Sequence, residues 1–144
     1  MNRDTEYLNV DIEVTARHDL QPLVDALADR VFVLHVGRIK GRHFAGLELA
    51  AMTKTADRTI RRLAAIVKSL PRSARGLWNR AQSRDLNIGI QAGCNRDAFR
   101  CVVGREAMRA ATDIGASIVI TVYGSAVGDH TTRNRRPTRP LQRM

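Results

Sequence analysis

The fold is decided by residues 8–16, which read Leu8-Asn9-Val10-Asp11-Ile12-Glu13-Val14-Thr15-Ala16. Apolar and polar residues alternate along this stretch without a break. Because successive side chains of a strand point to opposite faces of a sheet, the alternation predicts a strand with one buried face and one solvent-exposed face. The sequence therefore predicts a sheet that is covered on one side.

The rest of the chain divides into short segments that predict four helices and five further strands. The clearest helix follows Thr55, where apolar residues recur with i, i+3, i+4, i+7 spacing at Ile60, Leu63, Ala64 and Val67. The third helix directs Trp78 toward the core, and Gly115 closes the fourth. The expected helices begin at Asp19, Thr55, Ser73 and Glu106. The expected strands cover residues 31–36, 43–51, 86–90, 99–103 and 117–123, with turns at 37–41 and 95–97.

This order, β-α-β-β-α-α-β-β-α-β, predicts an α+β fold. Its first seven elements, β-α-β-β-α-α-β, match the split βαβ, ferredoxin-like order, and a further β-α-β extends it. We expect a mostly antiparallel sheet with its helices on one face. The other face is then the natural place for a binding surface.

The length and composition fit one domain followed by a tail. A chain of 144 residues, 44% of them hydrophobic, can bury a core without a disulfide or a metal. We expect residues 1–124 to form a single α/β domain, and residues 125–144 to be a disordered, basic tail rich in Arg and Pro. No apolar run approaches the ~20 residues of a membrane span, and the N-terminus lacks the apolar part of a signal peptide. A cytoplasmic protein without a membrane partner is expected.

The charge is strongly positive, with 24 Lys and Arg against 14 Asp and Glu. Such a balance favours polyanionic partners. Helical spacing gathers three arginines after Thr55 on the outward side, and the tail adds more. The candidate basic surface comprises Arg58, Arg61, Arg62, Arg133, Arg135, Arg136 and Arg139. The ordinary interpretation of the helical arginines is a solvated helix face, and the functional one is a site for a polyanion or an acidic protein.

Two carboxylates, Asp11 and Glu13, share the solvent-exposed face of the first strand and make a candidate sheet-face site. The strand rise places them roughly 6–7 Å apart. Carboxylate pairs at such distances serve glycosidases and metal sites. The commoner interpretation is a solvated strand face.

No catalytic, metal or cofactor site is expected. His35 and His43 stand on neighbouring strands, but two histidines without a further ligand at suitable spacing are a weak metal signal. No Gly-x-Ser-x-Gly turn and no glycine-rich phosphate loop are present. Cys94 and Cys101 flank the expected turn at 95–97 and are not cross-strand partners, so a disulfide is not expected.

An RNA-recognition domain would share the strand order and carry stacking aromatic rings on its sheet. The corresponding stretch here is Lys40-Gly41-Arg42-His43-Phe44-Ala45-Gly46-Leu47. It keeps one ring, Phe44, and has Arg42 and Leu47 where further rings are needed. Base stacking is therefore not predicted.

The segment after Met108, which reads Ile114-Gly115-Ala116-Ser117-Ile118-Val119-Ile120-Thr121-Val122-Tyr123, resembles the ending of a bacterial domain-of-unknown-function family. Members of that family close with a short helix, a Gly-Ala turn and a strand that finishes in Tyr. The order of the helix after Thr55, the Trp78 helix and the strand from Leu86 is similar as well. The resemblance covers roughly residues 7–123 and implies a small cytoplasmic α/β domain.

Two functions lead from the sequence, and a small-molecule enzyme ranks third behind them. The first is a non-catalytic protein-binding module, of an immunity or regulatory kind, that uses either the sheet face or the arginine helix face. The second is a nucleic-acid-associated protein that makes sequence-independent phosphate contacts through the tail and the helix face. We favour the protein-binding module with an unknown partner, and the sequence leaves the oligomeric state open.

Overall fold

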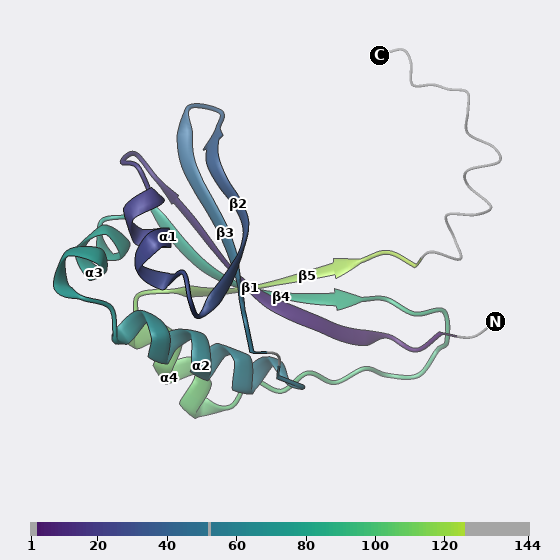
Figure 1. The fold of residues 1–144 in the computed structure, drawn as a ribbon. Helices are drawn as coiled ribbons and strands as arrows, with labels where there is room; N and C mark the ends of the chain where they lie inside the picture. The colour runs from purple at the N-terminus through teal and green to yellow at the C-terminus, as the bar shows by residue number, and fades with distance from the viewer. Residues whose placement is uncertain (1–2, 52, 126–144) are drawn as a thin grey trace, which may run out of the picture.

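The computed structural model describes residues 3–51 and 53–125 of the chain (Figure 1). Its strands are β1 (Glu6–Ala16), β2 (Val31–Ile39), β3 (Arg42–Leu49), β4 (Ser83–Gln91) and β5 (Ser117–Tyr123). Its helices are α1 (Gln21–Leu27), α2 (Ala56–Lys68), α3 (Arg72–Asn79) and α4 (Arg105–Asp113). The expected α+β class is confirmed. The tail from residue 126 onward lies outside the described residues, so its expected disorder stays a prediction.

The strands form one sheet in the order β2-β3-β1-β4-β5. Every neighbouring pair is antiparallel except β4 and β5, which are parallel. The chain reaches β5 through α4, because a parallel neighbour requires a crossover rather than a tight turn. The four helices lie against one face of this sheet, as expected (Figure 1).

The core lies between the sheet and the helices. In β1 the alternation is confirmed, since Val10, Ile12, Val14 and Ala16 are completely buried while the residues between them are partly exposed. Burying one such aliphatic side chain contributes about 1.5–3 kcal/mol. These residues pack in the same cluster as the apolar faces of the helices, which include Leu23, Ile60, Leu63 and Trp78.

Local signals in the sequence account for the helix ends. The Thr55 side chain accepts a hydrogen bond from Arg58 N at 3.2 Å, so it caps α2 as predicted. Gly115 follows α4 with a φ of 70°, which glycine adopts without strain. The α3 residue Trp78 is fully buried, and its Nε1 donates to Ile114 O at 2.7 Å, joining α3 to the end of α4.

Helices α2 and α4 lie side by side with their N-termini at the same end. Near their starts, Gly104 N donates to Asp57 Oδ1 at 2.7 Å. Near their ends, Lys68 Nζ lies 3.8 Å from Asp113 Oδ2. Two helices of one chain therefore present their outer surfaces as one layer.

The predicted strand at 99–103 and the hairpin turn before it are wrong. Residues 92–104 form neither helix nor strand, so the described residues build a sheet of five strands and the predicted β-α-β extension is not formed. Both edges of β4 are already paired, with β1 and β5, and a strand at 99–103 would find no free edge there. The segment is instead held near residues 3–5, where Gly93 N donates to Thr5 Oγ1 and Cys94 N to Arg3 O.

The turn between β2 and β3 is tighter than predicted. Strand β2 continues past Gly37, and only Lys40 and Gly41 connect it to β3. Both have positive φ, 53° and 81°, which is the backbone of a two-residue hairpin turn that matches the sheet twist. Strand β3 accordingly begins at Arg42 and ends at Leu49 rather than at Ala51.

Candidate functional site

The face of the sheet opposite the helices gathers four carboxylates and two amides on its three central strands. The pairing register places Asp11 opposite both Glu48 and Asn87, and Glu13 opposite Asp85. All of these side chains are partly buried. We call this surface the acidic face and define it by Asn9, Asp11, Glu13, Glu48, Asp85 and Asn87.

Amide groups hold three of these carboxylates, those of Asp11, Glu13 and Glu48, in position. Asn9 Nδ2 donates to Asp11 Oδ1 at 3.1 Å and to Glu48 Oε2 at 2.9 Å. Asn87 Nδ2 lies 3.3 Å from each oxygen of Glu13, and Asn87 Oδ1 accepts from Thr121 Oγ1 at 2.8 Å. The ion pairs in the described part of the chain involve other acids, so no cation neutralises this face there.

The crowding of negative charge alters the ionisation of Asp11. Burial, together with the neighbouring carboxylates of Glu48 and Glu13, raises the pKa of this carboxyl to about 6, and burial is the largest of these causes. A positive group placed on the acidic face would offset both effects, because an opposite charge favours the ionised carboxylate. Binding of a cation to the acidic face would therefore be electrostatically favourable.

Apolar side chains flank the acidic face. Phe32 is the cross-strand partner of Glu48, so it shares that face, and it is 56% exposed. Leu34 lies beside Gly46 and is 52% exposed. At the other end, Tyr123 lies beside Gly89 and is half exposed. The surface thus combines a charged centre with exposed apolar margins.

The two strand histidines do not form a site together. His35 packs against Phe44 on the open face, with ring centroids 5.5 Å apart. His43 lies on the helix side, where its Nδ1 is 4.0 Å from an Asp19 carboxylate oxygen. Alternation along the strands separates them, and the described residues contain no group of three or more His, Cys, Asp or Glu that could hold a metal ion. Neither Cys94 nor Cys101 is in a disulfide.

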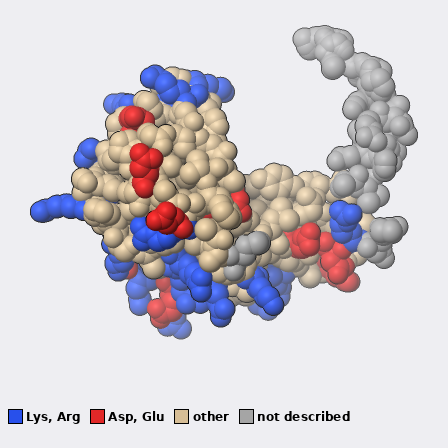
Figure 2. Space-filling model, viewed as in Figure 1, with Lys and Arg blue, Asp and Glu red and all other residues tan. Residues whose placement is uncertain are grey.

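The predicted helical arginines lie on the outer layer formed by α2 and α4. Arg58, Arg61 and Arg62 are exposed, and Arg61 Nε donates to Asp57 Oδ2 at 3.0 Å. Helix α4 adds the exposed Arg105 and Arg109, which the sequence analysis did not select. Figure 2 shows Lys and Arg gathered along the side of the molecule where α2 and α4 lie.

The remaining predicted arginines, Arg133, Arg135, Arg136 and Arg139, lie outside the described residues. Sequence reasoning selected Asp11 and Glu13 but missed Glu48 and Asp85 as their partners. The sequence did contain a signal for Glu48: it stands between two apolar residues, Leu47 and Leu49, as a residue on the solvent-exposed face of a strand does.

Comparison of the chain with protein-family models, with curated proteins and with solved structures finds no match. None of the helices in the described ranges is long and apolar enough to span a bilayer.

Proposed function

We propose that this chain is a non-catalytic protein-binding module whose acidic face takes a basic segment of a partner protein. The observation that carries the proposal is the set of four partly buried carboxylates on a sheet face that no described helix covers. Amides hold three of them, and none has a cationic partner among the described residues.

The chemistry of the face favours arginine in that partner. A guanidinium offers several N–H donors in one plane and bonds carboxylates in a bidentate manner. Asp11 and Glu48 face each other across the β1–β3 pair, so one guanidinium can contact both. The apolar margins at Phe32 and Leu34 favour a segment in which arginine stands near aliphatic or aromatic residues.

Protein binding can be tested with a labelled peptide. The probe is a fluorescein-labelled peptide of alternating Arg and Leu, and its control has Gln in place of Arg. The change Glu48→Gln together with Asp11→Asn should weaken binding of the Arg peptide by about tenfold or more, as expected when close charge pairs are lost. The change Glu106→Gln removes one negative charge on the helix layer and serves as the control.

The pH dependence gives the same test a second readout. Binding should weaken as the pH falls below about 6, since protonation of Asp11 removes one of the charges that attract the peptide. Equal binding of the Arg and Gln peptides, or binding unchanged by the acidic-face substitutions, would overturn the proposal.

A second candidate function is sequence-independent contact with nucleic acid. The layer formed by α2 and α4 supports it, because it carries Arg58, Arg62, Arg105 and Arg109 on one side of the molecule. The acidic face would repel phosphate, so this function would use the helix layer and leave the sheet face outward. We rank it second because the helical arginines are also explained as a solvated helix surface.

The ferredoxin-like arrangement of the strands and helices is a proposal as well. We propose that β1, α1, β2, β3, α2 and β4 form the split βαβ unit of a ferredoxin-like fold, with α3 inserted and α4–β5 added. The place of β1 between β3 and β4, antiparallel to both, supports this assignment. Membership of the domain-of-unknown-function family and a cytoplasmic location stay predictions.

A further inference from the structure

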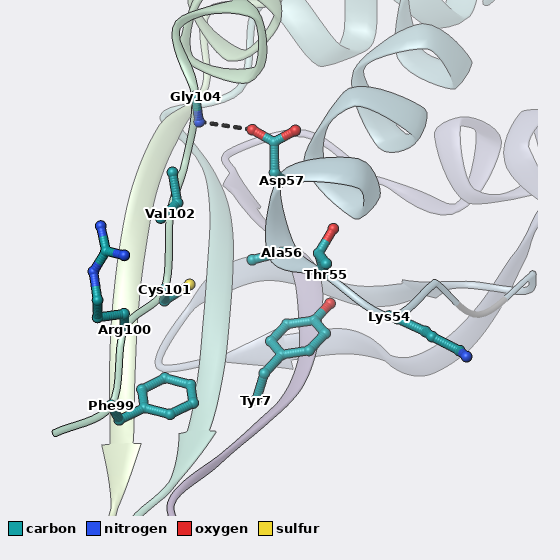
Figure 3. A pocket seen from close by; sticks show the side chains of 10 residues that line it. All are labelled: Tyr7, Lys54, Thr55, Ala56, Asp57, Phe99, Arg100, Cys101, Val102 and Gly104. Carbon is teal, nitrogen blue, oxygen red and sulfur yellow. Dashed lines mark hydrogen bonds between the residues drawn. The ribbon is translucent and has the colours of Figure 1, made fainter. Parts of the chain in front are cut away.

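A groove lies on the helix side of the sheet, away from the acidic face. Its volume is about 640 Å³, within the size range of small-molecule sites. The first turn of α2 forms one wall, and the irregular segment before α4 forms the other (Figure 3). The lining residues are Tyr7, Lys54, Thr55, Ala56, Asp57, Phe99, Arg100, Cys101, Val102 and Gly104.

Hydrogen bonds position the side chains and backbone that form the walls of the groove. Tyr7 Oη is 3.0 Å from Oγ1 of Thr59, which is almost completely buried, so the tyrosine ring is anchored as part of the wall. At the other end, the bond from Gly104 N to Asp57 joins the two walls (Figure 3). Burial raises the pKa of the Tyr7 hydroxyl, and this group therefore stays neutral at ordinary pH.

The walls are mainly apolar, and the free charges near them are positive. Phe99, Val102, Ala56 and the ring of Tyr7 supply carbon surface. Asp57 is already engaged by Gly104 N and by Arg61. Lys54 and Arg100 have no carboxylate partner in the described part of the chain. They stand on opposite walls, both are exposed, and in Figure 3 their side chains point outward from the groove.

We propose that this groove binds a small organic anion with an apolar body. The body would lie between Tyr7, Phe99 and Val102. Its anionic group would lie at the rim, where the exposed side chain of Lys54 or Arg100 would turn toward it. Charge complementarity selects an anion over a cation of the same shape, because the acid in the lining is already bonded. The Cys101 thiol, which points into the groove, would be covered by the ligand.

Two dyes that differ in one group test this directly. The first is 8-anilinonaphthalene-1-sulfonate, and the second is N-phenyl-1-naphthylamine, which has the same rings without the sulfonate. We expect the sulfonate to bind the full chain about tenfold more tightly, as one charge-assisted contact would produce. Changing both Lys54→Gln and Arg100→Gln should remove that difference and leave the binding of the neutral dye unchanged.

Two further variants locate the binding. Val102→Trp fills the groove and should abolish binding of both dyes, whereas Val33→Trp places the same ring at an exposed strand position elsewhere and should not. In a Cys94→Ser background, the sulfonate dye should slow alkylation of Cys101 by iodoacetamide. Unfolding curves of each variant show whether the fold is intact. Equal affinity for the two dyes, or dye binding and thiol reactivity unaffected by Val102→Trp, would overturn the proposal.

Discussion

Asp11 of β1 lies directly opposite Glu48 of β3, and the side-chain amide of Asn9 donates to both carboxylates. Like charges opposite each other in a sheet ordinarily destabilise it. Here the pair is retained in the middle of the sheet, with Glu13 and Asp85 beside it. The fold therefore carries an electrostatic cost at this surface, which the proposed binding of a cationic segment would offset.

Asp11→Asn should make that cost measurable. The folded state raises the pKa of Asp11 from its ordinary value of 3.8 to about 6, so folding favours the protonated carboxyl. At about pH 7 the carboxyl is charged, and the neutral amide should increase the free energy of unfolding by about 1–2 kcal/mol after solvent screening. The amide oxygen of Asn can still accept the bond from Asn9.

The pH dependence of that gain has a definite sign. As the pH falls through about 6 the wild-type carboxyl becomes protonated in the folded state, so the difference between variant and wild type should shrink and vanish below about 4. Urea unfolding across this range measures it, with the exposed Asp29→Asn as the matched control. A gain that stays constant with pH would show that charge is not its cause.

The sequence predicted the elements that depend on local signals. The alternation around Ile12, the Thr55 cap and the glycine after α4 each act within a few residues, and each is confirmed. The sequence also directed Trp78 to the core, where the structure buries it.

The acidic face was only half predicted, because its assembly depends on pairing between distant segments. Asp11 and Glu13 share a strand, but Glu48 and Asp85 join them only through the register of β3 and β4. The false strand at 99–103 has the same origin. Its alternating pattern is real, but a pattern in one segment does not show that β5 occupies the edge it would need.

Trp78→Phe should destabilise the protein more than the loss of ring size alone implies. The indole Nε1 donates to Ile114 O at 2.7 Å in a fully buried position. Phenylalanine leaves that carbonyl without its donor and leaves part of the cavity empty, so we expect a loss of about 2–4 kcal/mol. Chemical unfolding followed by far-UV circular dichroism measures it. An equally stable variant would show that the carbonyl finds another partner.

Asp57→Ala should loosen the junction of α2 and α4. The carboxylate accepts bonds from Gly104 N and from Arg61, and the first of these is the main cause of its lowered pKa. A lowered pKa means that the stabilisation is present above the ordinary value and is lost as the pH falls through the folded-state value. We expect a loss of about 1–2 kcal/mol near pH 7 that diminishes in acid. Asp29→Ala, which removes an exposed acid elsewhere, is the control.

Nucleic-acid binding by the helix layer makes a different prediction from protein binding by the sheet face. If α2 and α4 contact phosphate, the full chain should bind random duplex DNA with an affinity that falls steeply between ~50 and ~200 mM salt. Changing Arg58, Arg62, Arg105 and Arg109 to Gln should then reduce both the affinity and the slope of its salt dependence. A truncation at residue 124 separates the contribution of the tail arginines from that of the helices.

The acidic face supplies the control that separates the two functions. Asp11→Asn with Glu48→Gln lowers negative charge on the side opposite the helix layer, so it should leave DNA binding unchanged or slightly strengthen it, while it weakens binding of the Arg peptide. If DNA does not bind near physiological salt and the peptide does, the helical arginines are a solvated surface. If DNA binds and the peptide does not, the helix layer is the functional side of this domain.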